Sequence, residues 1–248
     1  MNAFIDIGNS NIVIGVGEDS VVSTYRYRTD VSKSSDEYYS LLKAHFENID
    51  QVIISSVVPQ VNGAFKTFLK RYFEIEPIFV GPGVKTGVKI KTENPKEVGA
   101  DLVAGAAGAL EAYGDNLIII DMGTATTYIY VEDKTLKGAA ITVGLDASKD
   151  CLVSKASKLL QFEFESPKNI LGTNTIDALN SGLLFGHTFQ IIGMVRNIQA
   201  AYKNDAIRVV VTGGAAKLIR DMLPESYDYD EHLVLKGLIA ILKRNQKA

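Results

Sequence analysis

The sequence predicts an α/β protein made of two duplicated domains, each with a mixed sheet flanked by helices. Two observations predict this class: strand and helix patterns alternate along the chain, and the whole pattern restarts near its middle. The restart places the domains at residues 1–114 and 115–248. With 46% hydrophobic and 22% charged residues, the composition is that of an ordinary globular protein, so disorder is not expected.

The first half is predicted to form strands where apolar residues alternate or run together, and helices where they recur every three or four positions. The predicted strands are residues 3–7, 11–16, 21–28, 51–58 and 77–81, and the predicted helices are residues 36–47, 59–73 and 101–113. Pro59 suits the first turn of a helix. The Ala- and Gly-rich text of 101–113 indicates a helix that another element approaches closely, and 82–99 is expected to be a long ordered loop.

The second half repeats this pattern of strands and helices. Its predicted strands are residues 116–123, 126–132, 135–141 and 207–214, and its predicted helices are residues 146–159, 174–202, 215–223 and 231–244. Asp146 and Asp150, near the start of the first of these helices, are interpreted as solvated or capping residues.

Charge and composition exclude several classes of protein. The net charge of −3 and the scattered basic residues argue against a nucleic-acid partner. No signal peptide and no apolar stretch of about 20 residues is evident, so a cytoplasmic protein without a membrane span is expected. A single cysteine, Cys151, excludes an intramolecular disulfide, and three scattered histidines argue against zinc. Cys151, His45, His187 and His232 are interpreted as structural.

Two turns of similar sequence contain the candidate ligand-binding residues. "FIDIGNSNIVIG" and "IIIDMGTATTYIYV" both place Asp-x-Gly at the first hairpin of a half, with Asp6 and Asp121 lying 115 residues apart. Gly8 and Gly123 let backbone approach a ligand, and the residues that follow offer hydroxyl or amide groups: Asn9, Ser10, Asn11, Thr124, Thr126 and Thr127. Each Asp can hold a magnesium ion directly or through water. One such turn alone is more often an ordinary bend; two at equivalent points predict a grip on nucleotide phosphates.

A third motif completes the set. "VVVTGGAAKLI" is an apolar strand that ends in Gly213-Gly214 and runs into a predicted helix. Alone, it equally fits a helix entry with Gly for tight packing; beside the two turns it suggests a platform for adenosine. The ordered triplet resembles the superfamily of sugar kinases, actin and 70-kDa chaperone ATPases.

Within that superfamily, the chain resembles the type III pantothenate kinases from residue 3 to about 245. The motifs that carry the resemblance are "DIGNSNIVIG", "GPGVKTGVKI", "NPKEVGAD", "DMGTATTYIYV", "TNTIDALNSGLLFG" and "TGGAAKLI". The resemblance implies two ribonuclease-H-like domains, a homodimer, and phosphorylation of the primary hydroxyl of pantothenate by ATP, with Mg²⁺ and a monovalent cation (K⁺ or NH₄⁺). The product would enter coenzyme A biosynthesis.

The resemblance also assigns roles to residues. The ATP-binding set would be Asp6, Ile7, Gly8, Asn9, Ser10, Asn11, Ile12, Val13, Gly123, Thr124, Gly213 and Gly214, with Asp6 near magnesium and Asp121 near the monovalent cation. The pantothenate set would be Gly99, Ala100, Asp101, Leu102 and Thr175, with Asp101 as the general base. From spacing alone, Asp101 is better explained as the N-cap of an Ala-rich helix.

Three positions depart from the family pattern. The family reads Gly-Ala-Asp-Arg where this chain has "GADL", so Leu102 removes a charged hydrogen bond of about 1.5–3 kcal/mol, equivalent to roughly 10- to 150-fold in binding. Val143-Gly144 stands where Pro-Gly is usual, and Ser10 replaces a commoner Thr. Two alternatives therefore stay open: a non-catalytic nucleotide-binding paralogue acting as an accessory or regulatory protein, and a kinase of another small hydroxylated acceptor.

Overall fold

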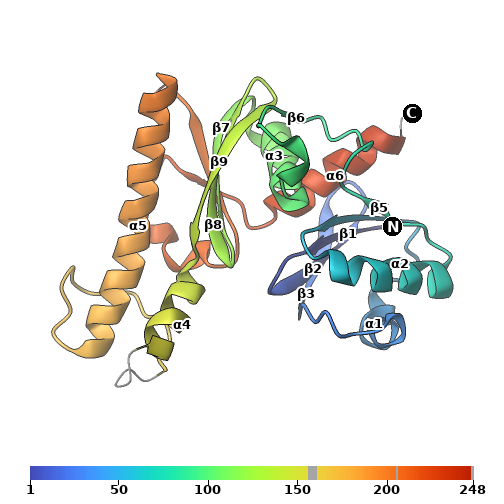
Figure 1. Ribbon diagram of the computed structural model, residues 1–248, viewed down its shortest axis with the longest axis horizontal. Helices are drawn as coiled ribbons and strands as arrows, with labels where there is room; N and C mark the ends of the chain where they lie inside the picture. The colour runs from blue at the N-terminus through green and yellow to red at the C-terminus, as the bar shows by residue number, and fades with distance from the viewer. Residues whose placement is uncertain (156–160, 205, 247–248) are drawn as a thin grey trace. The chain divides into compact units, whose positions relative to one another are not determined.

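The computed structural model describes residues 1–155, 161–204 and 206–246 (Figure 1). They form two compact units, of which the first comprises Met1–Gly114 and the chain from Leu233 onward, and the second comprises Asp115–His232. Among the described helices, none combines the length and apolar character needed to cross a lipid bilayer.

The first unit is a mixed sheet with strand order β3-β2-β1-β4-β5. Its elements are β1 (Asn2–Ile7), β2 (Asn11–Gly17), β3 (Val21–Arg28), α1 (Ser35–Leu42), β4 (Gln51–Ser56), α2 (Pro59–Phe73), β5 (Ile78–Phe79), β6 (Lys89–Ile90), α3 (Ala100–Tyr113) and α6 (Leu233–Gln246), with short 3-10 turns at Lys43–His45 and Pro95–Glu97. β2 is antiparallel to β1 and β3, whereas β4 is parallel to both β1 and β5.

Helices cover both faces of this sheet. On one face α1 and α2 bury aromatic side chains, among them Phe65 and Phe68, against β1, β2 and β4. On the other face α3 and α6 pack over Phe4 and Ile53.

The two helices of the second face touch backbone to backbone, because a Cβ on Gly237 would lie 1.8 Å from the carbonyl oxygen of Ala104. The small residues of α3 therefore admit α6, as the Ala- and Gly-rich sequence predicts.

The second unit repeats the topology, with strands in the order β11-β10-β7-β8-β9. Its elements are β7 (Asn116–Met122), β8 (Ala125–Glu132), β9 (Thr135–Val143), α4 (Leu145–Lys155), α5 (Thr175–Tyr202), β10 (Arg208–Thr212) and β11 (Asp228–Tyr229). β8 is antiparallel to β7 and β9, and β10 is parallel to β7 and β11. One face packs on α5 through Leu184, Ile191 and Val195. The α/β class with mixed sheets flanked by helices is thus confirmed.

Several elements differ from the sequence-based prediction. Residues 215–223 form two 3-10 turns, Ala216–Leu218 and Arg220–Met222, instead of one helix. Leu223 is extended because it precedes Pro224, which leaves no room for a longer helix. The two-residue strand β11 is too short to produce a hydrophobic period. Positions 156–159 of the predicted helix 146–159 lie outside the described residues.

The last helix does not belong to the domain in which the predicted boundary at 114/115 places it. Helix α6 follows the second unit in sequence, yet it packs on α3 and β1 and belongs to the first unit. The loop expected at 82–99 contains the short strand β6 and one 3-10 turn.

Candidate functional site

The turn between β1 and β2 is a compact polar loop of three residues, Gly8, Asn9 and Ser10. The Gly8 N–H donates to the carbonyl of Asn11 at 2.9 Å, which closes the turn. Thr29, just after β3, secures it: its N–H donates to the Ser10 carbonyl at 3.0 Å and its hydroxyl donates to the Gly8 carbonyl at 2.6 Å. Asn9 and Ser10 are exposed. The turn therefore presents polar groups from a backbone held in place by three hydrogen bonds.

Asp6 lies one residue before the end of β1, on the sheet face that α3 and α6 partly cover. In the register of the sheet it stands opposite Val13 on β2 and Ser55 on β4. Ser55 is fully buried, and its hydroxyl has no hydrogen-bond partner among the described residues. A buried hydroxyl left without a partner is costly unless a water or ion satisfies it. The position beside Asp6 therefore fits a hydrated cation.

Asp101 lies near the carboxyl ends of β1 and β4, as the β1–β2 turn does. It is the second residue of α3, and Gly99 rather than Asp101 is the N-cap of the helix. The expected alternative of a side-chain N-cap is thus wrong in position, although one Asp101 carboxylate oxygen does accept the N–H of Leu102 at 2.8 Å.

Gly99 makes room for this carboxylate. A Cβ on Gly99 would lie 2.3 Å from Asp101 Oδ1 and 3.3 Å from Val57 Cγ1. The Val57 N–H in turn donates to the carbonyl of Ile7 at 3.0 Å. Gly99 therefore lies close to both Asp101 and Val57, near the carboxyl ends of β1 and β4.

Burial raises the pKa of the Asp101 carboxyl above its usual value, although the N–H groups of Leu102 and of Asp101 itself donate to it and act in the opposite direction. A raised pKa makes a carboxylate a better proton acceptor. Leu102, half-buried at the next position, adds an apolar side chain and no charge.

In the second unit, the turn between β7 and β8 is tighter and is packed by two glycines. The Gly144 N–H donates to the carbonyl of Thr124 at 3.1 Å, and a Cβ on Gly144 would lie 2.4 Å from the Gly123 carbonyl oxygen. Gly213, at φ +93°, would place a Cβ 2.5 Å from Asp121 Oδ1. Sequence reasoning gave Gly144 no site role, because only the folded chain brings it against the turn.

Asp121 stands opposite Thr127 on β8 and Thr212 on β10. The hydroxyl of Thr127 is buried and has no hydrogen-bond partner within the described part of the chain. The position beside Asp121 thus also has an unpartnered buried hydroxyl, here on β8, where the first unit has Val13 on β2, and it fits a small cation too. No group of three or more His, Cys, Asp or Glu side chains suited to hold a metal by themselves occurs among the described residues.

The remaining expected site residues, Gly213, Gly214 and Thr175, belong to the second unit. Gly213 approaches Asp121 closely, which explains its lack of a side chain by packing; an adenosine platform at Gly213-Gly214 stays a prediction. A pocket of about 400 Å³ in the second unit is lined by both residues of β11 and by residues of the segment before it, among them Arg220. The guanidinium carbon of Arg220 lies 5.0 Å from the ring centre of Tyr229. Thr175 is exposed at the first position of α5, after the N-cap Asn174.

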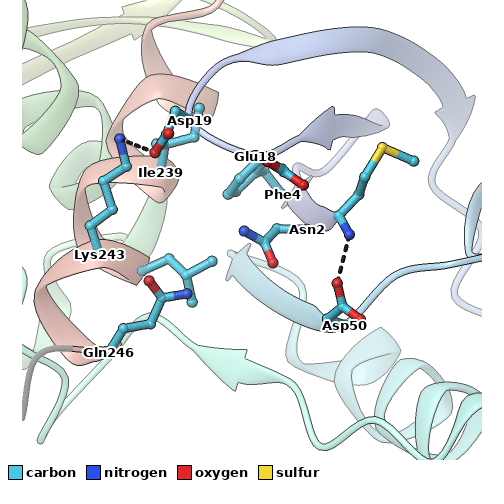
Figure 2. A pocket seen from close by; sticks show the side chains of 10 residues that line it. Asn2, Phe4, Glu18, Asp19, Asp50, Ile239, Lys243 and Gln246 are labelled. Carbon is cyan, nitrogen blue, oxygen red and sulfur yellow. Dashed lines mark hydrogen bonds and ion pairs between the residues drawn. The ribbon is translucent and has the colours of Figure 1, made fainter.

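A second pocket, of about 220 Å³, lies at the opposite end of the first sheet (Figure 2). Its lining includes Asn2 and Asp50 at the starts of β1 and β4, and Lys243 of α6, which pairs with Asp19 at 2.7 Å. Asn2 pairs with Gln51 and the β1–β2 turn follows Ile7, so the length of β1 separates this pocket from the turn. It contributes nothing to the candidate site.

Solved structures with the same fold include kinases and ATPases. A protein of Campylobacter jejuni described as a Baf family transcriptional activator superposes with a TM-score of 0.65 and 18% identity, over 99% of this chain and 100% of that one. A 2-dehydro-3-deoxygalactonokinase protein of Sinorhizobium meliloti gives 0.63 and 14%, over 98% and 96%. The activator of 2-hydroxyisocaproyl-CoA dehydratase from Clostridium difficile, solved with bound ADPNP, gives 0.57 and 12%, over 99% and 97%. At these identities the likeness establishes the fold.

The family follows from the sequence profile. The profile of the type III pantothenate kinases matches residues 3–197, which include both Asp-x-Gly turns, Asp101 and Thr175. Such a match supports a kinase-type phosphotransferase that binds nucleotide. The chain belongs to the type III pantothenate kinase family.

Proposed function

We propose that this protein transfers the γ-phosphoryl group of ATP to the primary hydroxyl of pantothenate, giving 4'-phosphopantothenate. The observation that carries the proposal is the position of Asp101: its carboxylate has a raised pKa and lies next to Gly99, which approaches Val57 at the carboxyl ends of β1 and β4, where the β1–β2 turn begins. A proton acceptor next to a phosphate-binding turn is what a kinase of alcohols requires.

The chemistry assigns one role to each group. As the hydroxyl oxygen bonds to the γ-phosphorus, its proton passes to Asp101, and the bond from that phosphorus to the β–γ bridging oxygen breaks to release ADP. A positioned base of this kind contributes roughly 10²–10⁴ in rate. The polar groups of the turn at Gly8, Asn9 and Ser10 would hold phosphate oxygens, and Thr124 of the second unit would supply a further contact to ATP.

Two cations fit the proposal. Asp6 beside the unpartnered Ser55 hydroxyl would hold Mg²⁺ through water, and Asp121 beside Thr127 would help to hold K⁺ or NH₄⁺. When bound, these ions offset negative charge on the phosphates.

We also propose that the active form is a homodimer. The second unit exposes large apolar side chains on β9, on α5 and in the segment before α5: Ile141, Val143, Ile170, Leu171, Ile176 and Phe189. A hydrogen bond of 3.2 Å from Gln190 to Thr142 ties α5 to β9, beside Phe189 and Ile141. Exposed apolar area of this kind marks interaction surfaces, and a second copy of the chain would cover it.

Leu102 favours one further candidate. An apolar side chain next to the base suits an acceptor without a carboxylate, and the same phosphoryl transfer would then act on another small alcohol.

A coupled ADP-release assay with millimolar pantothenate, with and without potassium, tests whether the protein phosphorylates pantothenate. Turnover that Asp101→Asn abolishes supports it. ATP hydrolysis or binding without pantothenate phosphorylation rejects pantothenate as the acceptor.

A further inference from the structure

Two arginines share a sheet face with Asp6. Arg26 and Arg28 are alternate residues of the edge strand β3, so their side chains leave the same face. In the register, Arg26 stands opposite Val13, which stands opposite Asp6. Tyr25, the residue before Arg26, leaves the opposite face and stacks on His45. Arg26, Val13, Asp6 and Ser55 therefore form one row across the sheet.

Both arginines are placed to reach the β1–β2 turn. Arg28 stands opposite Asn11, whose carbonyl closes the turn, and precedes Thr29, which donates two hydrogen bonds to it. Arg26 is two strand spacings from Asp6, about 10 Å between Cα atoms, a distance that a long side chain largely spans. The register thus places both arginines near the end of β3 that lies beside the turn, and not at the far end of the sheet.

Neither arginine has a charged partner within the described residues. Both side chains are exposed, and no ion pair links either of them to another residue in the described part of the chain. Residues 6–13, the expected phosphate loop, contain no Lys or Arg and one carboxylate, that of Asp6. The loop alone therefore cannot balance the charge of a triphosphate.

The duplicated unit provides an internal comparison. In its equivalent row, Asp121 stands opposite Thr127, and Thr127 stands opposite Ile141 on β9. Val143, opposite Ala125, occupies the place of Arg28. Because the same topology forms with exposed Ile and Val at these two positions, the arginines are not needed for the fold.

We propose that Arg26 and Arg28, named here the arginine pair, bind the phosphate chain of ATP in the first unit. The inference rests on the proposed kinase function and adds the cationic side chains that the loop lacks. Guanidinium groups bind phosphate oxygens in a bidentate manner and remain charged at every working pH. The acceptor is a poorer partner for the pair, because Asp101 is linked to β4, on the other side of β1 from β3.

The test uses the full chain with Arg26→Gln and Arg28→Gln, singly and together, and Arg71→Gln as the matched control. Arg71 is an exposed arginine of the same unit that pairs with Asp36. Calorimetry with ATP and with adenosine is expected to show at least tenfold weaker ATP binding by the double variant, and adenosine binding within twofold of wild type. The KM for ATP should rise while the KM for the acceptor stays within twofold, and the control should match wild type.

A second pair of variants separates charge from folding. Arg26→Lys with Arg28→Lys keeps both charges and should recover most of the lost affinity; an equal loss in the Lys and Gln doubles would overturn the inference. Unchanged ATP affinity in the Gln double variant, in a protein whose wild type phosphorylates pantothenate, would also overturn it and leave the kinase function intact. A wild-type protein that binds no ATP would contradict both the role of the arginine pair and the proposed kinase function.

Discussion

Substitution of Gly99 by Ala is expected to disable catalysis while leaving the fold in place. The added Cβ would lie 2.3 Å from Asp101 Oδ1, so the carboxylate oxygen must withdraw by about 1 Å to reach ordinary contact distance. Gly99 has φ −57°, which any residue adopts, so no backbone strain is introduced. A misplacement of about 1 Å can cost roughly 10²-fold in rate. We therefore expect kcat to fall by about two orders of magnitude.

The assay is the steady-state rate of ADP release at saturating ATP and acceptor, with thermal unfolding measured in parallel. Gly63→Ala is the matched control, because a Cβ there meets nothing within 4 Å; this exchange inside α2 should leave kcat unchanged and stabilise the helix by about 1 kcal/mol. Since Gly99 is an N-cap, its exchange should cost stability only modestly. Wild-type kcat in Gly99→Ala would refute the assignment of Asp101 as the base in the position that the structure gives it.

Three further variants test the site. Asp101→Asn should abolish turnover. Because burial raises the folded-state pKa of Asp101, the wild-type carboxyl stabilises the fold fully only below its unfolded pKa of about 3.9, and this contribution is lost as the pH rises through the folded pKa. The Asn variant should thus gain unfolding free energy relative to wild type as the pH rises above about 4, and a gain that shrinks in a pH series of thermal melts would contradict this. Leu102→Arg should lower the KM for pantothenate at least tenfold, whereas an unchanged KM would show that no carboxylate is held at this position. Gly213→Ala, at φ +93° with its Cβ 2.5 Å from Asp121 Oδ1, should cost about 2–4 kcal/mol in urea unfolding of the second unit, and a cost below about 0.5 kcal/mol would show that the turn yields freely.

Hydrophobic patterns were sufficient to predict most strands and the duplication, because each strand and helix buries apolar residues within its own unit. Strands β1 and β7 each end in Asp-x-Gly, and the structure places both turns at the same point of the same topology. The packing of two elements that are far apart in the sequence could not be predicted in this way. No local pattern in α6 specifies that it packs on α3, although Gly237 and Gly108, which allow the close crossing, are visible in the sequence.

The candidate site was predictable at the level of residue types and not at the level of contacts. Asp101 follows from its motif, but its raised pKa depends on burial that only the fold creates. Gly144 was noted only as a departure from a family pattern, since its contact with the Thr124 carbonyl joins residues 20 positions apart. Residues 215–223 are predicted as one helix, but they form two 3-10 turns, and the second ends at Leu223, which is extended before Pro224.

The differences between the duplicated units follow the chemistry of a phosphoryl transfer. One reaction needs one base and one place for the polyphosphate, so two identical units would hold a redundant set. In the first unit the row of Asp6 ends in Arg26, and Asp101, the proposed base, lies near the carboxyl ends of β1 and β4. In the second unit Gly144 packs against the turn and Gly213 against Asp121, and the row ends in exposed Ile141. Since both rows belong to sheets of one topology, folding does not require the difference. The charged side chains of β3 instead suit an anion, and the exposed apolar side chains of β9 suit a protein surface.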